Sequence, residues 1–358
     1  MRINNAGTTG QSRPAGTPPK LSIFSLAARD GNLTRLFVIM VAIFVVMSLA
    51  RPDIFPTLSN FNSMSVQIPE IGILAIAIML TMLTGGIDLS VTSTANLCGI
   101  VTAIILTALV PPTAAGPQVV FGIAVAVAVA ITIGLACGLF NGYLISRVGI
   151  TPILATLGTL TLYMGIAIAI TKGTAMFAVP QFLWLGSGTI VGFVPVPLII
   201  FAALALVFAL ILNRTAFGFR LYMMGTNATA ARFSGINNAR MLVQTYMLSG
   251  LLASIAGLIF LARSNSAKAD YGSTYILQAI LIAVLGGVNP SGGFGKIAGL
   301  VMALLSLQFL SSGLSMLLIR YSGSNFLKEF AWGALLIAVM VIDYYSNRRR
   351  DRALVEKT

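Results

Sequence analysis

The stretch L-T-G-G-I-D-L-S-V-T-S, residues 83–93, joins two long apolar runs through paired glycines, an acid and several hydroxyl side chains. Of the nine acidic residues in the chain, Asp88 is the one set most deeply among hydrophobic neighbours. Glycines permit a sharp bend, and an acid inside a membrane segment is a functional-site hypothesis by default. The stretch therefore predicts a bent, polar connection between two membrane helices.

The composition of the whole chain agrees with this prediction. The chain is 57% hydrophobic and only 9% charged, whereas soluble domains are about 25% charged. Apolar runs of about 20 residues, long enough to cross a hydrocarbon layer of roughly 30 Å, recur along it. We therefore predict an all-α polytopic membrane protein with an internal repeat. The ten expected spans are 34–50, 67–84, 91–110, 118–138, 151–171, 196–212, 241–262, 276–287 (which residues 271–275 could extend), 297–319 and 328–346.

The distribution of lysine and arginine predicts the orientation of these spans. If the N-terminus is cytoplasmic, sixteen basic residues face the cytoplasm and six face outside, as the positive-inside bias requires. Both termini are then cytoplasmic. We expect a disordered cytoplasmic tail over residues 1–33, a membrane domain over 34–346 and a basic cytoplasmic tail over 347–358.

Several functions are disfavoured by the same composition. The net charge of +13 gathers at the ends of the spans and has no basic-aromatic module beside it, so we expect no nucleic-acid partner. There is no histidine, and both cysteines lie in apolar runs, so neither a metal site nor a disulfide is expected. The run Gly292–Lys296 lacks the spacing and the final hydroxyl residue of a phosphate-binding loop. We therefore expect no enzymatic activity and no cofactor on this chain.

The opening motif occurs twice. Gly85, Gly86, Asp88 and Ser90 align with a second set that follows another apolar run, namely Gly286, Gly287, Asn289 and Ser291. Repeats of this kind are common in transporters, where broken helices meet near a shared cavity. For Asp88 we weigh a cap on the following helix against a polar group lining the pathway, and we favour the cap because Asp, Asn and Ser accept from free backbone N–H groups.

Small residues recur every four positions in two of the expected spans. One stripe comprises Gly134, Gly138 and Gly142, and the other Ser249, Ala253 and Gly257. Such stripes let helix backbones approach closely in lipid. We interpret both stripes as tight packing rather than as a substrate path.

The basic loop 213–240 is predicted to hold a short helix. Thr226 or Asn227 would cap its start, residues 228–234 would form two turns, and Gly235 would end it in a left-handed conformation. We expect its exposed face to be small, with Ala230 and Ala231 beside Phe233. A short capped helix of this kind suits insertion into a groove of another protein, whereas an inert connecting loop would need neither cap.

These motifs carry a resemblance to the ribose-type ABC sugar-importer permeases, over residues 34–346. The matching stretches are T-G-G-I-D-L-S at 84–90, N-G-Y-L-I at 141–145, P-I-L-A-T-L-G-T-L at 152–160, G-T-N-A-T-A-A-R-F-S-G-I at 225–236 and L-G-G-V-N-P-S-G-G-F-G at 285–295. The chain departs from the usual pattern at Thr92, Ile153 and Thr226, which leaves the transported sugar open.

The resemblance implies a bacterial inner-membrane location, surrounded by lipid, and a set of partners. These are an ABC ATPase subunit that carries ATP and Mg, a second permease chain (identical or paralogous) and an extracytoplasmic sugar-binding protein. The segment 225–236 would be the coupling helix that docks on the ATPase. Its candidate residues are Gly225, Asn227, Ala230, Ala231, Arg232, Phe233, Gly235 and Ile236.

Two other classes remain as alternatives. An ion-coupled secondary transporter of a small polar solute would need ionisable groups inside the membrane, and the candidates are Glu70 and Asp88, with Asp343 near the end of the last span. A purely structural membrane protein would not need the capped basic loop or the repeated bends. We favour the ATP-driven permease.

Overall fold

The computed structural model describes residues 31–111, 116–190 and 194–318, together with scattered residues from 327 to 341. In this part of the chain, regular structure is helical except for the short antiparallel pair β1 (Thr189–Ile190) and β2 (Val194–Pro195). Eight of the described helices are long and apolar enough to cross a membrane. The prediction of an all-α polytopic membrane protein is confirmed.

The helices follow the apolar runs closely. They are α2 (Gly31–Ala50), α3 (Leu58–Met82), α4 (Val91–Leu109), α5 (Pro117–Tyr143) with a π-helical turn η1 (Leu144–Val148), α6 (Pro152–Thr171), the 3-10 turn η2 (Pro180–Phe182), α7 (Trp184–Ser187), α8 (Val196–Arg214), α9 (Ala216–Thr226), α10 (Ala228–Phe233), α11 (Asn238–Ser264), α12 (Tyr275–Leu285) and α13 (Ile297–Leu317).

Three boundaries differ clearly from the expected spans. Helix α5 with its π-helical turn continues to Val148, ten residues beyond the expected end at 138. Helix α3 begins nine residues before position 67, because the Thr57 hydroxyl caps it by accepting from the Asn60 N–H at 3.3 Å. Helix α12 has only 11 residues, about 16 Å at 1.5 Å per residue, and residues 271–274 before it form turns rather than extending it. Helix α2 begins at Gly31, within the last residues of the expected tail 1–33. The rest of that tail, most of the tenth expected span, Asp343 and the C-terminal tail lie outside the described residues.

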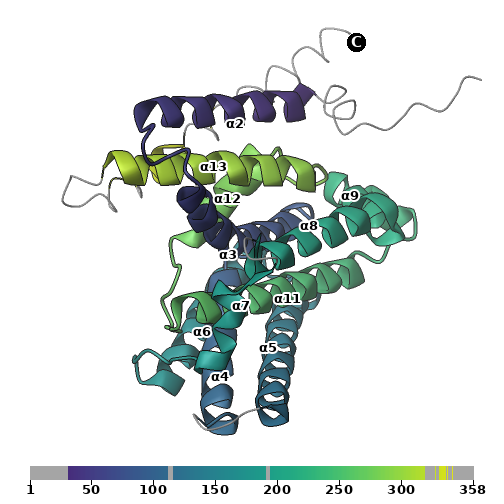
Figure 1. Ribbon diagram of the computed structural model, residues 1–358. Coiled ribbons are helices and arrows are strands. Elements are labelled where there is room, and N and C mark those ends of the chain that lie inside the picture. Colours follow the sequence, from purple (N-terminus) through teal and green to yellow (C-terminus); the bar gives the residue numbers. More distant parts are fainter. Residues whose placement is uncertain are drawn as a thin grey trace, which may run out of the picture.

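The core is built around α3 and α11, which are buried along most of their length. Helices α4, α5 and α6 pack at one end of the molecule, and α2 lies along α13 at the other (Figure 1). Helix α2 is mostly exposed. Its apolar side chains therefore meet the surroundings, as expected for a peripheral membrane helix.

The two stripes of small residues form close helix contacts. A Cβ placed on Gly134 would overlap the carbonyl of Gly250, and one on Gly138 would overlap the carbonyl of Tyr246, so α5 and α11 touch through their backbones. Gly257 meets α4 in the same way at the carbonyl of Ala95. The interpretation of both stripes as packing surfaces is confirmed.

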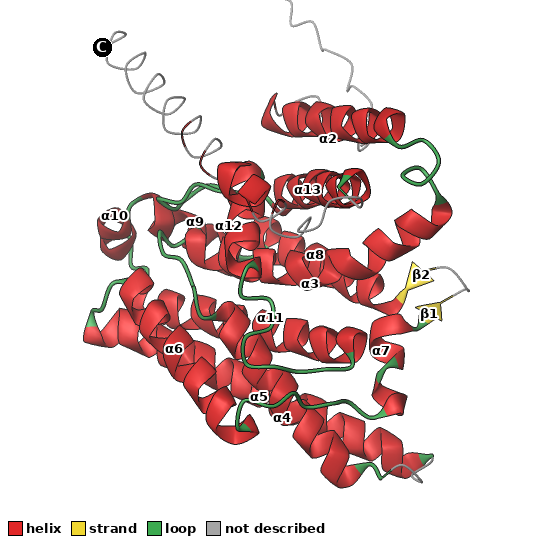
Figure 2. Cartoon of the chain, turned by 90° about the vertical axis from the view of Figure 1, so that its left-hand side faces the viewer, coloured by secondary structure: helices red, strands yellow, loops and turns green. Residues whose placement is uncertain are grey.

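The loop helix and the short strands lie far apart. In Figure 2, α10 lies at one end of the bundle, whereas β1, β2 and α7 lie at the other end. This separation agrees with the odd number of spans expected between these two segments. Which end faces the cytoplasm, and with it the position of the termini, remains a prediction from the basic residues.

Candidate functional site

Helix α3 ends in the first of the two predicted bends. The N–H of Gly86 donates to the carbonyl of Thr81 at 3.2 Å, and the N–H of Gly85 donates to that of Met82 at 2.9 Å. Gly85 has a φ of +80°, a conformation that glycine adopts without strain. These bonds form a Schellman motif, which satisfies carbonyls that a helix end leaves free.

The second bend repeats this motif at the end of α12. The N–H of Val288 donates to the carbonyl of Ala283 at 3.0 Å, and the N–H of Gly287 donates to that of Val284 at 2.9 Å. Gly287 has a φ of +86°. The left-handed glycine is thus the second of its pair here and the first of its pair at Gly85, so the two bends differ by one residue.

Each bend continues into an Asx turn, in which an Asp or Asn oxygen accepts the N–H two residues on. Asp88 Oδ1 accepts from the N–H of Ser90 at 3.0 Å, and Asn289 Oδ1 accepts from that of Ser291 at 3.0 Å. The expected helix caps are wrong in both copies. Ser90 precedes α4 without a side-chain capping bond, and α13 begins well beyond Ser291.

Asp88 and Ser90 together join the first bend to α11 and α5. Its Oδ1 also accepts from the Ser90 hydroxyl at 2.7 Å, and its Oδ2 accepts from the Ser249 hydroxyl of α11 at 2.9 Å. The Asn141 amide of α5 donates to Ser90 Oγ at 2.8 Å. Only 2% of the Asp88 surface is exposed, so the carboxylate holds the first bend to its neighbours and does not face open space.

Sequence reasoning missed the partners Ser249 and Asn141. Each stood in a motif that had been singled out for another reason, Ser249 in the small-residue stripe and Asn141 in N-G-Y-L-I. A hydroxyl and an amide inside apolar runs were the available signal, because buried polar groups need hydrogen-bonding partners.

The loop helix α10 has both predicted ends. Asn227 Oδ1 accepts from the N–H of Ala230 at 2.9 Å. Gly235 has a φ of +82°, and the N–H of Ile236 donates to the carbonyl of Ala231 at 3.0 Å, which closes the C-terminal end. The short helix, its Asn227 cap and its left-handed glycine are confirmed.

The exposed face of α10 differs from the expected one. Phe233 is 88% exposed, and Ala230 and Arg232 are exposed as well, but Ala231 is fully buried. A six-residue helix needs one face packed on the protein to be stable, and Ala231 joins the main hydrophobic core. The exposed face of α10 therefore includes Ala230, Arg232 and Phe233, and Ala231 is not part of it.

The end of α9 connects α10 to both bends. A Cβ on Gly225 would overlap the carbonyl oxygen of Leu83 and the N–H of Gly293, two atoms that bond each other at 3.0 Å. The Tyr222 hydroxyl donates to the carbonyl of Gly295 at 2.7 Å, and burial raises the pKa of this phenol, which favours the donor form. The two bends and the α9–α10 segment thus form one continuous contact, which we call the Gly225 junction.

Comparison with known proteins points to one family. Residues 60–342 match the family described as branched-chain amino acid transport system / permease component. The autoinducer 2 import system permease protein LsrD of Yersinia enterocolitica is 34% identical over 279 residues, 76% of this chain and 79% of that protein. LsrD of Enterobacter sp. (strain 638) is 36% identical over 281 residues, 76% of this chain and 80% of that protein. No solved structure matches the chain.

Proposed function

The chain belongs to the family described as branched-chain amino acid transport system / permease component. From this membership we propose how the protein works and which solute it carries. It pairs with a second permease chain and docks on an ATPase subunit that binds ATP and Mg. An extracytoplasmic binding protein delivers the solute. The solute is a small polyhydroxyl compound such as a pentose, or the autoinducer 2 for whose import the LsrD relatives are named.

One observation carries the coupling role of α10. The helix is held at both ends by its own residues, yet it leaves Phe233 88% exposed. A large aromatic side chain on a rigid, exposed helix is typical of an anchor that fills a partner's pocket. Arg232 beside it adds a charged contact at the rim. These features support docking into a groove of the ATPase.

The Gly225 junction supports a route from the ATPase to the membrane. Closure of the ATPase dimer on ATP would shift α10, and the junction would pass the shift to the ends of α3 and α12. Interfaces packed this tightly switch between discrete arrangements rather than deforming smoothly. The permease would thereby alternate between outward-open and inward-open packings.

Replacing Phe233 tests the docking role. We expect Phe233→Ala to leave expression and thermal stability unchanged, because the side chain touches little of its own chain, and to reduce recovery of the ATPase in a pull-down about tenfold or more, as for a hot-spot residue. Gly235→Val should reduce it too, since a β-branched residue strains the left-handed stop. Phe177→Ala is the matched control, because Phe177 is 62% exposed and lies in the segment that leads to α7.

The outcomes separate clearly. Undiminished ATPase recovery and full solute uptake by both α10 variants would sink the coupling role. Loss of recovery in the Phe177 control would mean that general damage, rather than docking, explains the effect.

The energy source has its own test. Uptake that stops with vanadate and survives an uncoupler is expected for an ATP-driven importer, and the opposite pattern would favour an ion-coupled carrier. In the structure, Glu70 is 1% exposed and pairs with Arg263, and Asp88 is occupied by three donors. Both acids are thus engaged by groups of the chain itself, Glu70 through Oε2 and Asp88 through both oxygens, which favours the ATP-driven class.

A further inference from the structure

A partly open cavity lies between helices of the chain, away from the first bend and from α10. It is bounded by α3, α12, α13 and Trp332, and its volume is about 400 Å³, within the range of roughly 300–1,000 Å³ common for small-molecule sites. On α3 it opens beside Gln67 and Ile71, about 18–24 Å along the helix axis from Leu83 at 1.5 Å per residue. Its α3 wall is therefore separate from Leu83 and the first bend, whereas its α12 wall ends at Ile282, whose carbonyl accepts from the N–H of Gly286 at 2.9 Å in the second bend.

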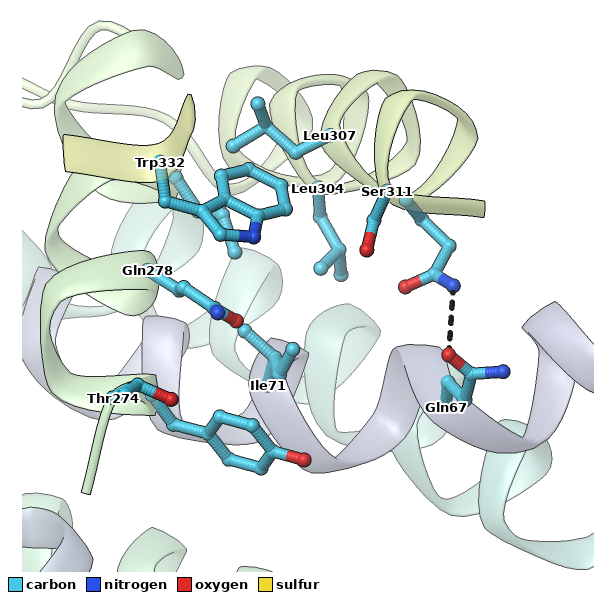
Figure 3. Close-up of a pocket in the computed structure, with 11 residues that line it drawn as sticks. Gln67, Ile71, Thr274, Gln278, Leu304, Leu307, Ser311 and Trp332 are labelled. Atoms are coloured by element: carbon cyan, nitrogen blue, oxygen red, sulfur yellow. Dashed lines mark hydrogen bonds between the residues drawn. The ribbon is translucent and has the colours of Figure 1, made fainter. Parts of the chain in front are cut away.

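Amide side chains from three different helices meet at this cavity. They are Gln67 of α3, Gln278 of α12 and Gln308 of α13. Gln308 is 5% exposed and donates to Gln67 Oε1 at 3.3 Å. Figure 3 shows Gln278 extending into the cavity from the side opposite Gln67. Such a gathering of amides inside an apolar bundle needs a reason, because polar groups in a membrane core are expensive.

Several of these polar groups have no partner within the described part of the chain. Gln67 also donates to Ser63 at 3.2 Å, but the Gln278 amide and the Ser311 and Thr274 hydroxyls make no side-chain hydrogen bond to another described residue. The side chains of Thr274, Gln278 and Ser311 face the cavity from the start of α12, from α12 and from α13 (Figure 3). These groups are only partly buried, so they remain accessible to a polar ligand, and amides and hydroxyls can both donate to it and accept from it.

The remaining lining is apolar and aromatic. Trp332 lies over the cavity, and Leu304, Leu307 and Ile71 close it between the glutamines (Figure 3). An indole ring has an apolar face suited to the C–H face of a sugar ring, and its N–H can meet a hydroxyl. Apolar walls with a few convergent polar groups are the usual form of a ligand site.

No described residue lining the cavity is charged. The nearest acid in sequence, Glu70, is paired with Arg263 and accepts from the Tyr275 hydroxyl at 3.4 Å. A carboxylate, an amine or a zwitterionic amino acid would therefore lose its hydration without gaining a countercharge. A ligand with several hydroxyls and no charge matches amides, which both donate and accept.

We propose that this cavity binds a neutral polyhydroxyl compound of monosaccharide size, held by Gln67, Gln278, Gln308 and Ser311 against Trp332. The inference rests on the proposed function in one respect, namely that the bound compound is the transported solute within the permease. Binding itself needs neither the ATPase nor the binding protein. The two can therefore be tested apart.

The chain offers a direct probe, because Trp184 and Trp332 are its two tryptophans. In full-length protein carrying Trp184→Phe and held in lipid nanodiscs, Trp332 is the sole indole. We expect saturable fluorescence changes on titration with at least one of D-ribose, D-xylose, D-glucose and myo-inositol, and none with L-leucine or acetate. Gln278→Leu and the smaller change Ser311→Ala should each weaken binding about tenfold, as expected for the loss of one ligand hydrogen bond.

Gln118→Leu is the matched control, since Gln118 is exposed in the first turn of α5. Equal binding by this control and the parent, with weaker binding by both cavity variants, supports the site. No saturable change with any of the four polyhydroxyl probes would overturn it, and so would binding that both cavity variants leave unchanged. Response to L-leucine would overturn the neutral-ligand class.

Uptake separates this proposal from the function it rests on. If the parent complex takes up a probe in an ATP-dependent way while both cavity variants bind and transport it normally, the cavity is wrong and the permease function stands. If the nanodisc site behaves as expected but the complex shows no ATP-dependent uptake, the proposed function fails and the site remains.

Discussion

The two bends of the repeat share a backbone and differ in their surroundings. Asp88 and Asn289 make the same Asx turn after the same type of helix end. In the first turn Asp88 and Ser90 are both buried, whereas in the second turn Asn289 is only partly buried and Ser291 is exposed. The local sequence therefore sets the backbone conformation of each turn, and the neighbouring helices determine whether the turn is buried or exposed.

The acid occupies the buried copy, contrary to the usual preference of charges for water. The number of donors explains this arrangement. Asp88 receives an N–H and two hydroxyls from Ser90 and Ser249, and a carboxylate has acceptor sites for all of them without a donor of its own. Asn289 receives one N–H, which the single oxygen of an amide satisfies.

The largest effect we expect comes from removing the acceptor in each copy. Asp88→Leu leaves buried donors of Ser90 and Ser249 without partners, which costs about 1–3 kcal/mol for each group. We therefore expect the free energy of unfolding to fall by about 3–5 kcal/mol. Asn289→Leu loses one half-exposed bond and should cost about 1 kcal/mol. Thermal unfolding of purified permease in one detergent measures the difference.

A conservative variant sharpens the same contrast. Asp88→Asn keeps Oδ1 for Ser90 and turns a donor toward Ser249, whose hydroxyl can accept, so the loss should stay near about 1 kcal/mol. If Asn proves as damaging to uptake as Leu at normal expression, the negative charge matters for transport. The account of Asp88 as a holding residue would then be wrong.

The next effect concerns the contact that joins the two bends. Gly225→Ala places a Cβ against the backbone of both Leu83 and Gly293, and strain of this kind costs about 1–3 kcal/mol. Because the junction lies beside α10, we expect solute uptake to fall more than protein yield falls. Uptake per unit of purified complex is the measurement.

Gly158→Ala on α6 is the control, since a Cβ there meets nothing within 4 Å. Its uptake and yield should match those of the parent. Normal uptake by Gly225→Ala would show that the bends need not stay in contact for the transport cycle.

The sequence predicted structure that depends on neighbouring residues better than structure that depends on distant ones. Apolar runs set the helices, and the Asn227 cap and the Gly235 stop of α10 were predictable because each acts within a few residues of itself. The burial of Ala231 was not, since it depends on which side of a short helix meets the core. Likewise, the shared chemistry of Asp88 and Asn289 suggested a cap, and only the geometry showed that the helices begin too late.

Contacts between distant residues lay beyond the sequence. Ser249 follows Asp88 by 161 positions, and Gln308 follows Gln67 by 241. No local pattern pairs such residues. A chemical signal was present in the sequence. Gln278 and Gln308 stand inside apolar runs and Gln67 stands at the start of one, and amide side chains in a membrane segment usually face a partner or a cavity.

The smallest effect we expect isolates one hydroxyl in each setting. Ser249→Ala removes a single donor from Asp88, whose Oδ1 keeps both bonds from Ser90, so the cost should be about 1 kcal/mol. Ser291→Ala should change stability by less than about 0.5 kcal/mol, because the side chain is exposed and its backbone N–H still reaches Asn289. Thermal unfolding of both variants and the parent in the same detergent measures the difference between the two losses of stability. Equal losses in the two variants would mean that burial does not separate the two turns, and the contrast between them would have to rest on Asp88 and Asn289 alone.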